Sequence, residues 1–134
     1  MQRLLALVAL LLLAPVPAMA QGAPSEIADS FFATLKSGDY SRAFSDIWGS
    51  SLMKTKPLEV SAVINQVGVA FQTYGTPEGY ELVEEKVTSP SFRTNTYLVR
   101  APMGPLFFRI QFYRFGSSWK VQRLDFADQL SRLP

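Results

Sequence analysis

The stretch Leu106–Phe126, LFFRIQFYRFGSSWKVQRLDF, decides the fold, because it places seven aromatic side chains within twenty-one residues. Its apolar and polar residues alternate on either side of Gly116 and Ser117, which is typical of two strands joined by a short turn. Alternation sends every second side chain to the same face of a sheet. The aromatic residues are therefore expected to serve mainly as a core and partly as a contact surface.

Two further strand-like runs precede this hairpin. The four predicted strands cover 80–88, 92–101, 106–115 and 119–126. Their connections, SPS, PMGP and GSS, are short, so consecutive strands are expected to be antiparallel neighbours. The sequence therefore predicts a four-stranded antiparallel meander.

Three helices are predicted before the strands. The first begins at Ser25 as its cap and ends at Gly38, and the second follows a cap at Ser41. The third begins near Pro57 and ends at Gly75. Its predicted apolar face is Leu58, Val63, Val67, Phe71 and Tyr74. Helices followed by a meander predict an α+β domain, with the N-terminal helices packed on one face of the sheet.

The register of the strands assigns the two faces of the sheet. Centring the first turn on PMGP places Val99 opposite Phe108, and centring the second on Gly116 and Ser117 places Phe112 opposite Val121. The face toward the helices is then Tyr97, Val99, Phe108, Ile110, Phe112, Trp119 and Val121.

Strict alternation along the last strand would bury Arg123 and Asp125 and expose Leu124 and Phe126. Burying an unpaired carboxylate costs several kcal/mol, whereas burying an apolar side chain contributes about 1.5–3 kcal/mol. A one-residue β-bulge near Gln122 and Arg123 resolves this conflict. It places Leu124 and Phe126 in the core and Asp125 outside, near Arg109.

The N-terminus has the pattern of a secretory signal peptide over residues 1–20: Arg3, an apolar run over 4–13, and small residues at Ala18 and Ala20. The apolar run is about half of the roughly 20 residues that a membrane-spanning helix needs, so no membrane anchor is expected. The sequence predicts an exported protein, periplasmic or secreted. The mature chain, 21–134, suits a single domain.

The amino-acid composition limits the side chains that could act in catalysis, bind a metal or bind nucleic acid. The sequence has neither cysteine nor histidine, so the usual general base and the commonest metal ligands are missing, and no metal or cofactor is predicted. Without Arg3, the 13 basic residues become 12 against 11 acidic ones, a net charge of +1. That balance gives no basic surface for nucleic acid, and no nucleic-acid partner is expected.

The sheet face away from the helices mixes arginine with apolar and aromatic side chains. Such a face is either an ordinary solvated surface or an interface with a second copy or another protein, because arginine, tyrosine and phenylalanine are enriched in interface cores. The interface candidates are Leu98, Phe107, Arg109, Tyr113 and Phe115.

The order of elements, with LKSGDYSRAF between helices and FYRFGSSWKVQRLDF as the closing hairpin, resembles the nuclear transport factor 2-like superfamily. It is most similar to small exported bacterial domains of unknown function in that superfamily. The resemblance spans Ser25 to Phe126 and implies a curved sheet wrapped on a long helix as a cone, often with a cavity at its open end and often dimeric.

Two functions are compatible with this resemblance. The first is an exported, non-catalytic binding or interaction module with a small apolar cavity for an apolar ligand. The second is a cavity enzyme of the isomerase or lyase type, for which Asp125 is the catalytic candidate only if it faces inward. Aromatic residues that could line the cavity, or belong to the core, are Tyr40, Trp48, Phe71, Tyr74, Tyr97 and Phe112.

Overall fold

Three helices and then four strands follow one another along the chain, as predicted. The structure is a computed structural model that describes residues 23–134; the predicted signal peptide, 1–20, and the predicted mature terminus at Gln21 lie outside the described residues. The helical elements are α1 (Pro24–Lys36), α2 (Tyr40–Ile47), the 3-10 helix η1 (Leu52–Thr55) and α3 (Pro57–Tyr74). The strands are β1 (Gly79–Ser89), β2 (Phe92–Ala101), β3 (Gly104–Phe115) and β4 (Ser118–Ala127), followed by the 3-10 helix η2 (Leu130–Arg132).

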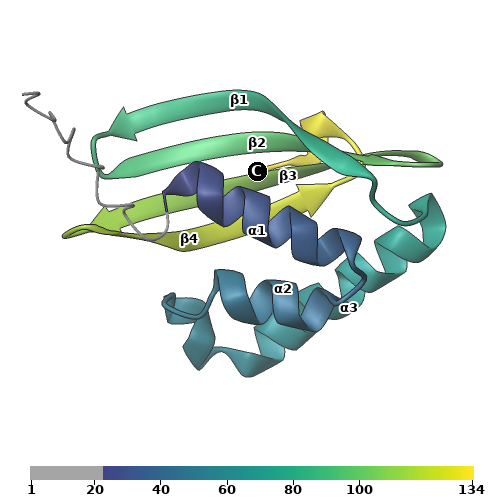
Figure 1. The fold of residues 1–134 in the computed structure, drawn as a ribbon, viewed down its shortest axis with the longest axis horizontal. Helices are drawn as coiled ribbons and strands as arrows, with labels where there is room; N and C mark the ends of the chain where they lie inside the picture. The colour runs from purple at the N-terminus through teal and green to yellow at the C-terminus, as the bar shows by residue number, and fades with distance from the viewer. Residues whose placement is uncertain (1–22) are drawn as a thin grey trace, which may run out of the picture.

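The strands form one antiparallel sheet in the order β1-β2-β3-β4 (Figure 1). The helices lie on one side of it: α1 crosses the sheet, α2 lies beside α1, and the end of α3 reaches the turn between β2 and β3 (Figure 1). We call the side toward the helices the inner face and the other side the outer face. The predicted α+β architecture is confirmed.

Two predicted helix caps, Ser25 and Ser41, each lie two residues after the observed cap. The cap of α1 is Ala23, and Pro24 occupies the first turn, where its missing N–H costs nothing. The cap of α2 is Asp39, whose carboxylate accepts a hydrogen bond from the backbone N–H of Arg42 at 3.1 Å. Aspartate caps a helix as well as serine does, so Ser41 is left inside the helix.

The first hairpin is tighter than predicted. Ala101 pairs with Gly104 across a two-residue turn, so that Val99 lies opposite Leu106 and not opposite Phe108. The end of α3 supports this turn, since the backbone N–H of Met103 donates to the carbonyl of Tyr74 at 2.8 Å. The register error is two residues, and an even shift leaves every side chain on its predicted face.

The predicted bulge in β4 is confirmed. Gln111 pairs with Arg123 and Phe112 pairs with Val121, which leaves Gln122 unpaired. Beyond the bulge Leu124 is buried, and the ring of Phe126 stacks on that of Phe108 with centroids 5.5 Å apart.

Aromatic side chains fill the space between the helices and the sheet. The rings of Phe31 and Phe32 on α1 both contact Phe108 edge to face, and Phe44 on α2 contacts Phe31. The predicted inner face is buried apart from Trp119, which is half-buried. One predicted core residue is misplaced: Leu58 is 84% exposed, because Val60, in the same turn of α3, is the residue that packs against the core.

Replacing Phe108 with alanine should lower the free energy of unfolding by about 3–5 kcal/mol, the cost of a large cavity in a packed core. The matched variant Phe115→Ala removes the same atoms from a side chain that is 70% exposed, and should change stability by less than about 0.5 kcal/mol. Urea unfolding of both variants measures the difference. Equal losses would contradict the assignment of the two faces.

Candidate functional site

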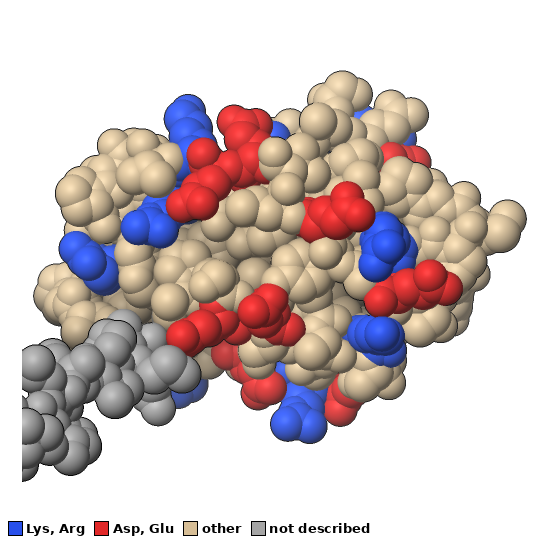
Figure 2. All heavy atoms as spheres, turned by 45° about the horizontal axis from the view of Figure 1, so that its top comes forward, with Lys and Arg blue, Asp and Glu red and all other residues tan. Residues whose placement is uncertain are grey.

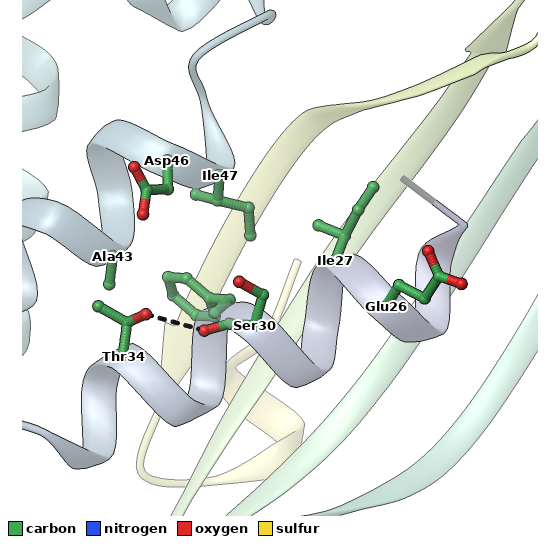
Figure 3. Close-up of a pocket in the computed structure, with 8 residues that line it drawn as sticks. Glu26, Ile27, Ser30, Thr34, Ala43, Asp46 and Ile47 are labelled. Atoms are coloured by element: carbon green, nitrogen blue, oxygen red, sulfur yellow. Dashed lines mark hydrogen bonds between the residues drawn. The ribbon is translucent and has the colours of Figure 1, made fainter. Parts of the chain in front are cut away.

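A hollow of about 240 Å³ lies between α1 and α2. Its floor is apolar and consists of Ile27 and Phe31 from α1 and Ala43 and Ile47 from α2 (Figure 3). Phe31 and Ala43 also belong to the core, so the floor is fixed by the packing of the domain.

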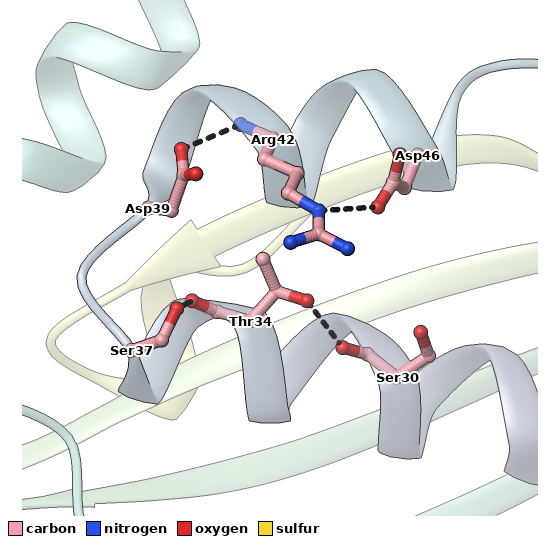
Figure 4. Close-up of polar contacts among 6 residues, drawn as sticks. All are labelled: Ser30, Thr34, Ser37, Asp39, Arg42 and Asp46. Carbon is pink, nitrogen blue, oxygen red and sulfur yellow. Dashed lines mark hydrogen bonds and ion pairs between the residues drawn. The ribbon is translucent and has the colours of Figure 1, made fainter.

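The rim of this hollow is polar. Glu26 and Asp46 flank the two isoleucines in Figure 3, and Ser30 and Thr34 add hydroxyl groups. Asp46 pairs with Arg42 at 3.6 Å, one turn earlier on α2 (Figure 4). Glu26 has no salt-bridge partner within residues 23–134. Two carboxylates therefore stand above an apolar floor.

A second hollow, of about 380 Å³, continues from the first toward the β3–β4 hairpin. The two share Ile27, Asp46 and Ile47, and the second adds Trp119 and Lys120 from β4. We call the continuous depression the α1–α2 groove. It offers an apolar trough with Glu26 and Asp46 along one part and with Trp119 and Lys120 at its other end.

The six predicted cavity residues do not meet in one cavity. Trp48, Tyr97 and Phe112 are core residues, and Phe71 is also buried. Tyr40 stacks on Phe71 with ring centroids 5.5 Å apart, and these two line a shallow hollow beside α3. The sequence missed the α1–α2 groove because it depends on how two helices lie beside one another, which periodicity does not encode.

Two of these tyrosines have a raised pKa. Burial raises the pKa of Tyr97, against a smaller opposing effect of the hydrogen bond that Asn95 donates to its hydroxyl. The hydrogen bond between Tyr74 and the carboxylate of Asp128, at 3.1 Å, raises the pKa of Tyr74. Neither arrangement activates a base, because both hold the tyrosine in its neutral form.

The predicted interface candidates lie on the outer face, but part of that face is occupied by the chain itself. Arg109 donates from Nε to Thr96 and from Nη1 to the main-chain oxygen of Pro134 at 2.7 Å. Figure 1 shows the yellow C-terminal segment returning to the sheet. Leu98 and Phe107 are half-buried, whereas Tyr113 and Phe115 are exposed.

Asp125 points to the outer face, away from the aromatic core. It lies opposite Arg109 in the register, but its carboxylate pairs with Arg123 at 2.7 Å. Sequence reasoning missed a different carboxylate: Asp29 on α1 accepts a hydrogen bond from the hydroxyl of Tyr80. Asp29 is exposed, and it lines none of the hollows described above.

Charged side chains of both signs are interspersed on the face shown in Figure 2. Over the described part of the chain, no three acidic side chains gather as a metal ion would require. No helix within residues 23–134 is both long enough and apolar enough to cross a membrane.

The geometry defines an α+β cone of the nuclear transport factor 2-like fold. A crystal structure from Campylobacter jejuni, named "Putative NTF2-like transpeptidase", superposes with a TM-score of 0.57 at 16% identity and covers 76% of this chain and 99% of that one. This similarity supports the fold that the resemblance implied. No family model and no curated protein matches the sequence.

The raised pKa of Tyr97 predicts a loss of stability in alkali. Below the ordinary value of 10.0 the tyrosine is neutral in both states; above it the unfolded chain ionises first, and the free energy of unfolding falls until the pH passes the folded value. Urea unfolding from about pH 9 to about pH 11 should show this fall, and Tyr97→Phe should reduce it. An equal fall in the free energy of unfolding in the variant would contradict the assignment to Tyr97. The difference between variant and native protein at neutral pH measures the loss of the hydrogen bond from Asn95.

Proposed function

We propose that the protein is an exported, non-catalytic binding or interaction module. The observation that carries this proposal is the filled interior: Phe44, Phe108 and Phe112 are completely buried within one aromatic core. A ligand or partner would then bind at the surface, and the α1–α2 groove combines an apolar floor with charged side chains at its rim.

The chemistry of the groove favours a partner with an apolar body and a positive charge. Ile27 and Ile47 would contact an aliphatic stem, while Glu26 and Asp46 would attract a cation at its end. A lysine-type side chain on another protein has this shape. The hydroxyl groups of Ser30 and Thr34 add hydrogen-bonding capacity beside the cation.

The name of the similar Campylobacter structure raises transpeptidation as an alternative. Ser51 and Lys54 have the S-x-x-K spacing of penicillin-binding proteins. Here Ser51 caps the short helix η1 by accepting a hydrogen bond from the N–H of Met53 at 3.1 Å, and Lys54 is exposed. Neither residue lines the α1–α2 groove, so the spacing alone gives that activity no support.

The isomerase or lyase alternative has one supporting observation, the Asp29–Tyr80 hydrogen bond near Tyr97. A tyrosine bonded to a carboxylate can exchange protons, but a catalytic pair also needs a substrate cavity beside it. Tyr80 stacks instead on Phe32, with ring centroids 4.3 Å apart. Packing against the core is a sufficient reason for its position.

Export is tested by the mass of the mature chain. Expressed with its full N-terminus in a host with a secretory pathway, the protein should be recovered outside the cytoplasm, beginning at Gln21. Intact-mass spectrometry measures this directly. Soluble cytoplasmic protein that retains residues 1–20 would contradict export.

The groove is tested with two small probes of equal length and opposite charge. Hexylammonium should shift the backbone amide NMR signals of Ile27, Ser30 and Ile47, whereas hexanoate should not, because the rim is acidic. The double variant Glu26→Gln with Asp46→Asn should remove the preference. Similar shifts from both probes, or shifts confined to other surfaces, would refute the proposed chemistry.

A further inference from the structure

Helix α3 is unusually poor in charge for a helix at the surface. Glu59 is its one charged residue among 18, yet only Val67 and Phe71 are buried. Leu58 is 84% exposed and Val69 is 61% exposed. A surface helix normally presents several charged side chains to water, so an exposed face with one charge and two large apolar side chains points to a covering partner.

The exposed residues of α3 follow a coiled-coil spacing. Steps of four, three, four and three residues connect Leu58, Ala62, Asn65, Val69 and Gln72, all of them exposed. This is the alternation of a and d positions in a heptad, which forms a seam along one side of a helix. We call these five residues the α3 seam. It carries no charge, and its two amides can both donate and accept hydrogen bonds.

The seam forms a ridge between two hollows. Asn65 and Val69 line both of them. The hollow on one side, about 630 Å³, also contains Tyr40 and Phe71, and the hollow on the other side, about 410 Å³, contains Ala70 and Phe126. A helix laid along the ridge would find apolar walls to either side.

We propose that the α3 seam binds the same seam of a second copy in antiparallel orientation. An uncharged surface that combines apolar and amide side chains is complementary to itself, as an interface with two-fold symmetry requires. In the antiparallel register Leu58 packs on Val69 of the partner subunit, and Ala62 packs on Asn65 of the partner subunit. The two large apolar side chains of the seam, Leu58 and Val69, then meet each other.

Helix electrostatics select the antiparallel arrangement. Parallel helices would place the two positive N-terminal ends side by side and bring the two Glu59 carboxylates together. Antiparallel helices set opposite ends of the two dipoles against each other and separate these carboxylates. The association is expected to be reversible, since one helix with its flanking hollows is smaller than the interface of a permanent dimer.

This surface differs from the outer face of the sheet, where the sequence places its interface candidates. The α3 seam lies on the helical side of the molecule (Figure 1). Matched variants can therefore separate the two surfaces: Val69→Glu introduces a charge on the seam, and Phe115→Glu introduces the same charge on the outer face, at side chains that are 61% and 70% exposed.

Sedimentation equilibrium of the mature chain, from micromolar to millimolar concentration, tests the proposal. The native protein should dimerise reversibly, Val69→Glu should be monomeric throughout this range, and Phe115→Glu should behave as the native protein does. Circular dichroism verifies that both variants are folded; if Val69→Glu is not, Leu58→Glu takes its place. A monomeric native protein, or dissociation by Phe115→Glu but not by the seam variant, overturns the proposal.

The orientation can be tested because the chain contains no cysteine. Leu58→Cys and Val69→Cys variants are prepared separately, mixed and oxidised. The antiparallel register predicts a disulfide between the two different variants, with little cross-linking of either variant alone. Efficient cross-linking of each variant to itself would require parallel helices and overturn the proposed register.

Discussion

A single unpaired residue, Gln122, allows the whole of β4 to contribute to the core. Val121 before it and Leu124 after it both face the helices, although regular alternation would put them on opposite faces. Without the bulge, either the aromatic end of β4 or its charged end would face the wrong medium, and burying an unpaired carboxylate is the more costly error. The stacking of Phe126 on Phe108 depends on this one insertion.

The aromatic core that results also limits the function. Rings from the helices and the strands fill the interior, and the hollows described above lie where elements meet at the surface. The α1–α2 groove arises because α2 has its own short apolar face, which shares Ala43 and Ile47 between the core and the groove. Its polar rim follows from the solvent-facing positions of the same two helices. The proposed binding surface is thus a consequence of efficient packing elsewhere.

The sequence predicts those features that follow from local period and from the cost of burying charge. The four strands, their faces, the bulge in β4 and the end of α3 at Gly75 all belong to this class. Features that depend on distant segments are not accessible in this way. The C-terminal residues have no periodicity that predicts their return to Arg109, and no helical pattern states that α1 and α2 leave a groove. Leu58 fits the apolar face of α3 by spacing, but Val60 in the same turn packs against the core instead.

The inner face of the sheet, its outer face and the exposed side of α3 differ in what covers them and in how many charged residues they carry. The inner face of the sheet is covered by helices, and the outer face is crossed by arginines and partly occupied by the C-terminal segment. The exposed side of α3 has no cover and a single charged residue, Glu59, a combination that favours self-association in water. The seam residues line neither hollow of the α1–α2 groove, so two copies joined at α3 would keep both grooves open. A dimer of this kind could engage two cationic side chains of one partner at once, and linked contacts raise the overall affinity of grooves that bind weakly one at a time.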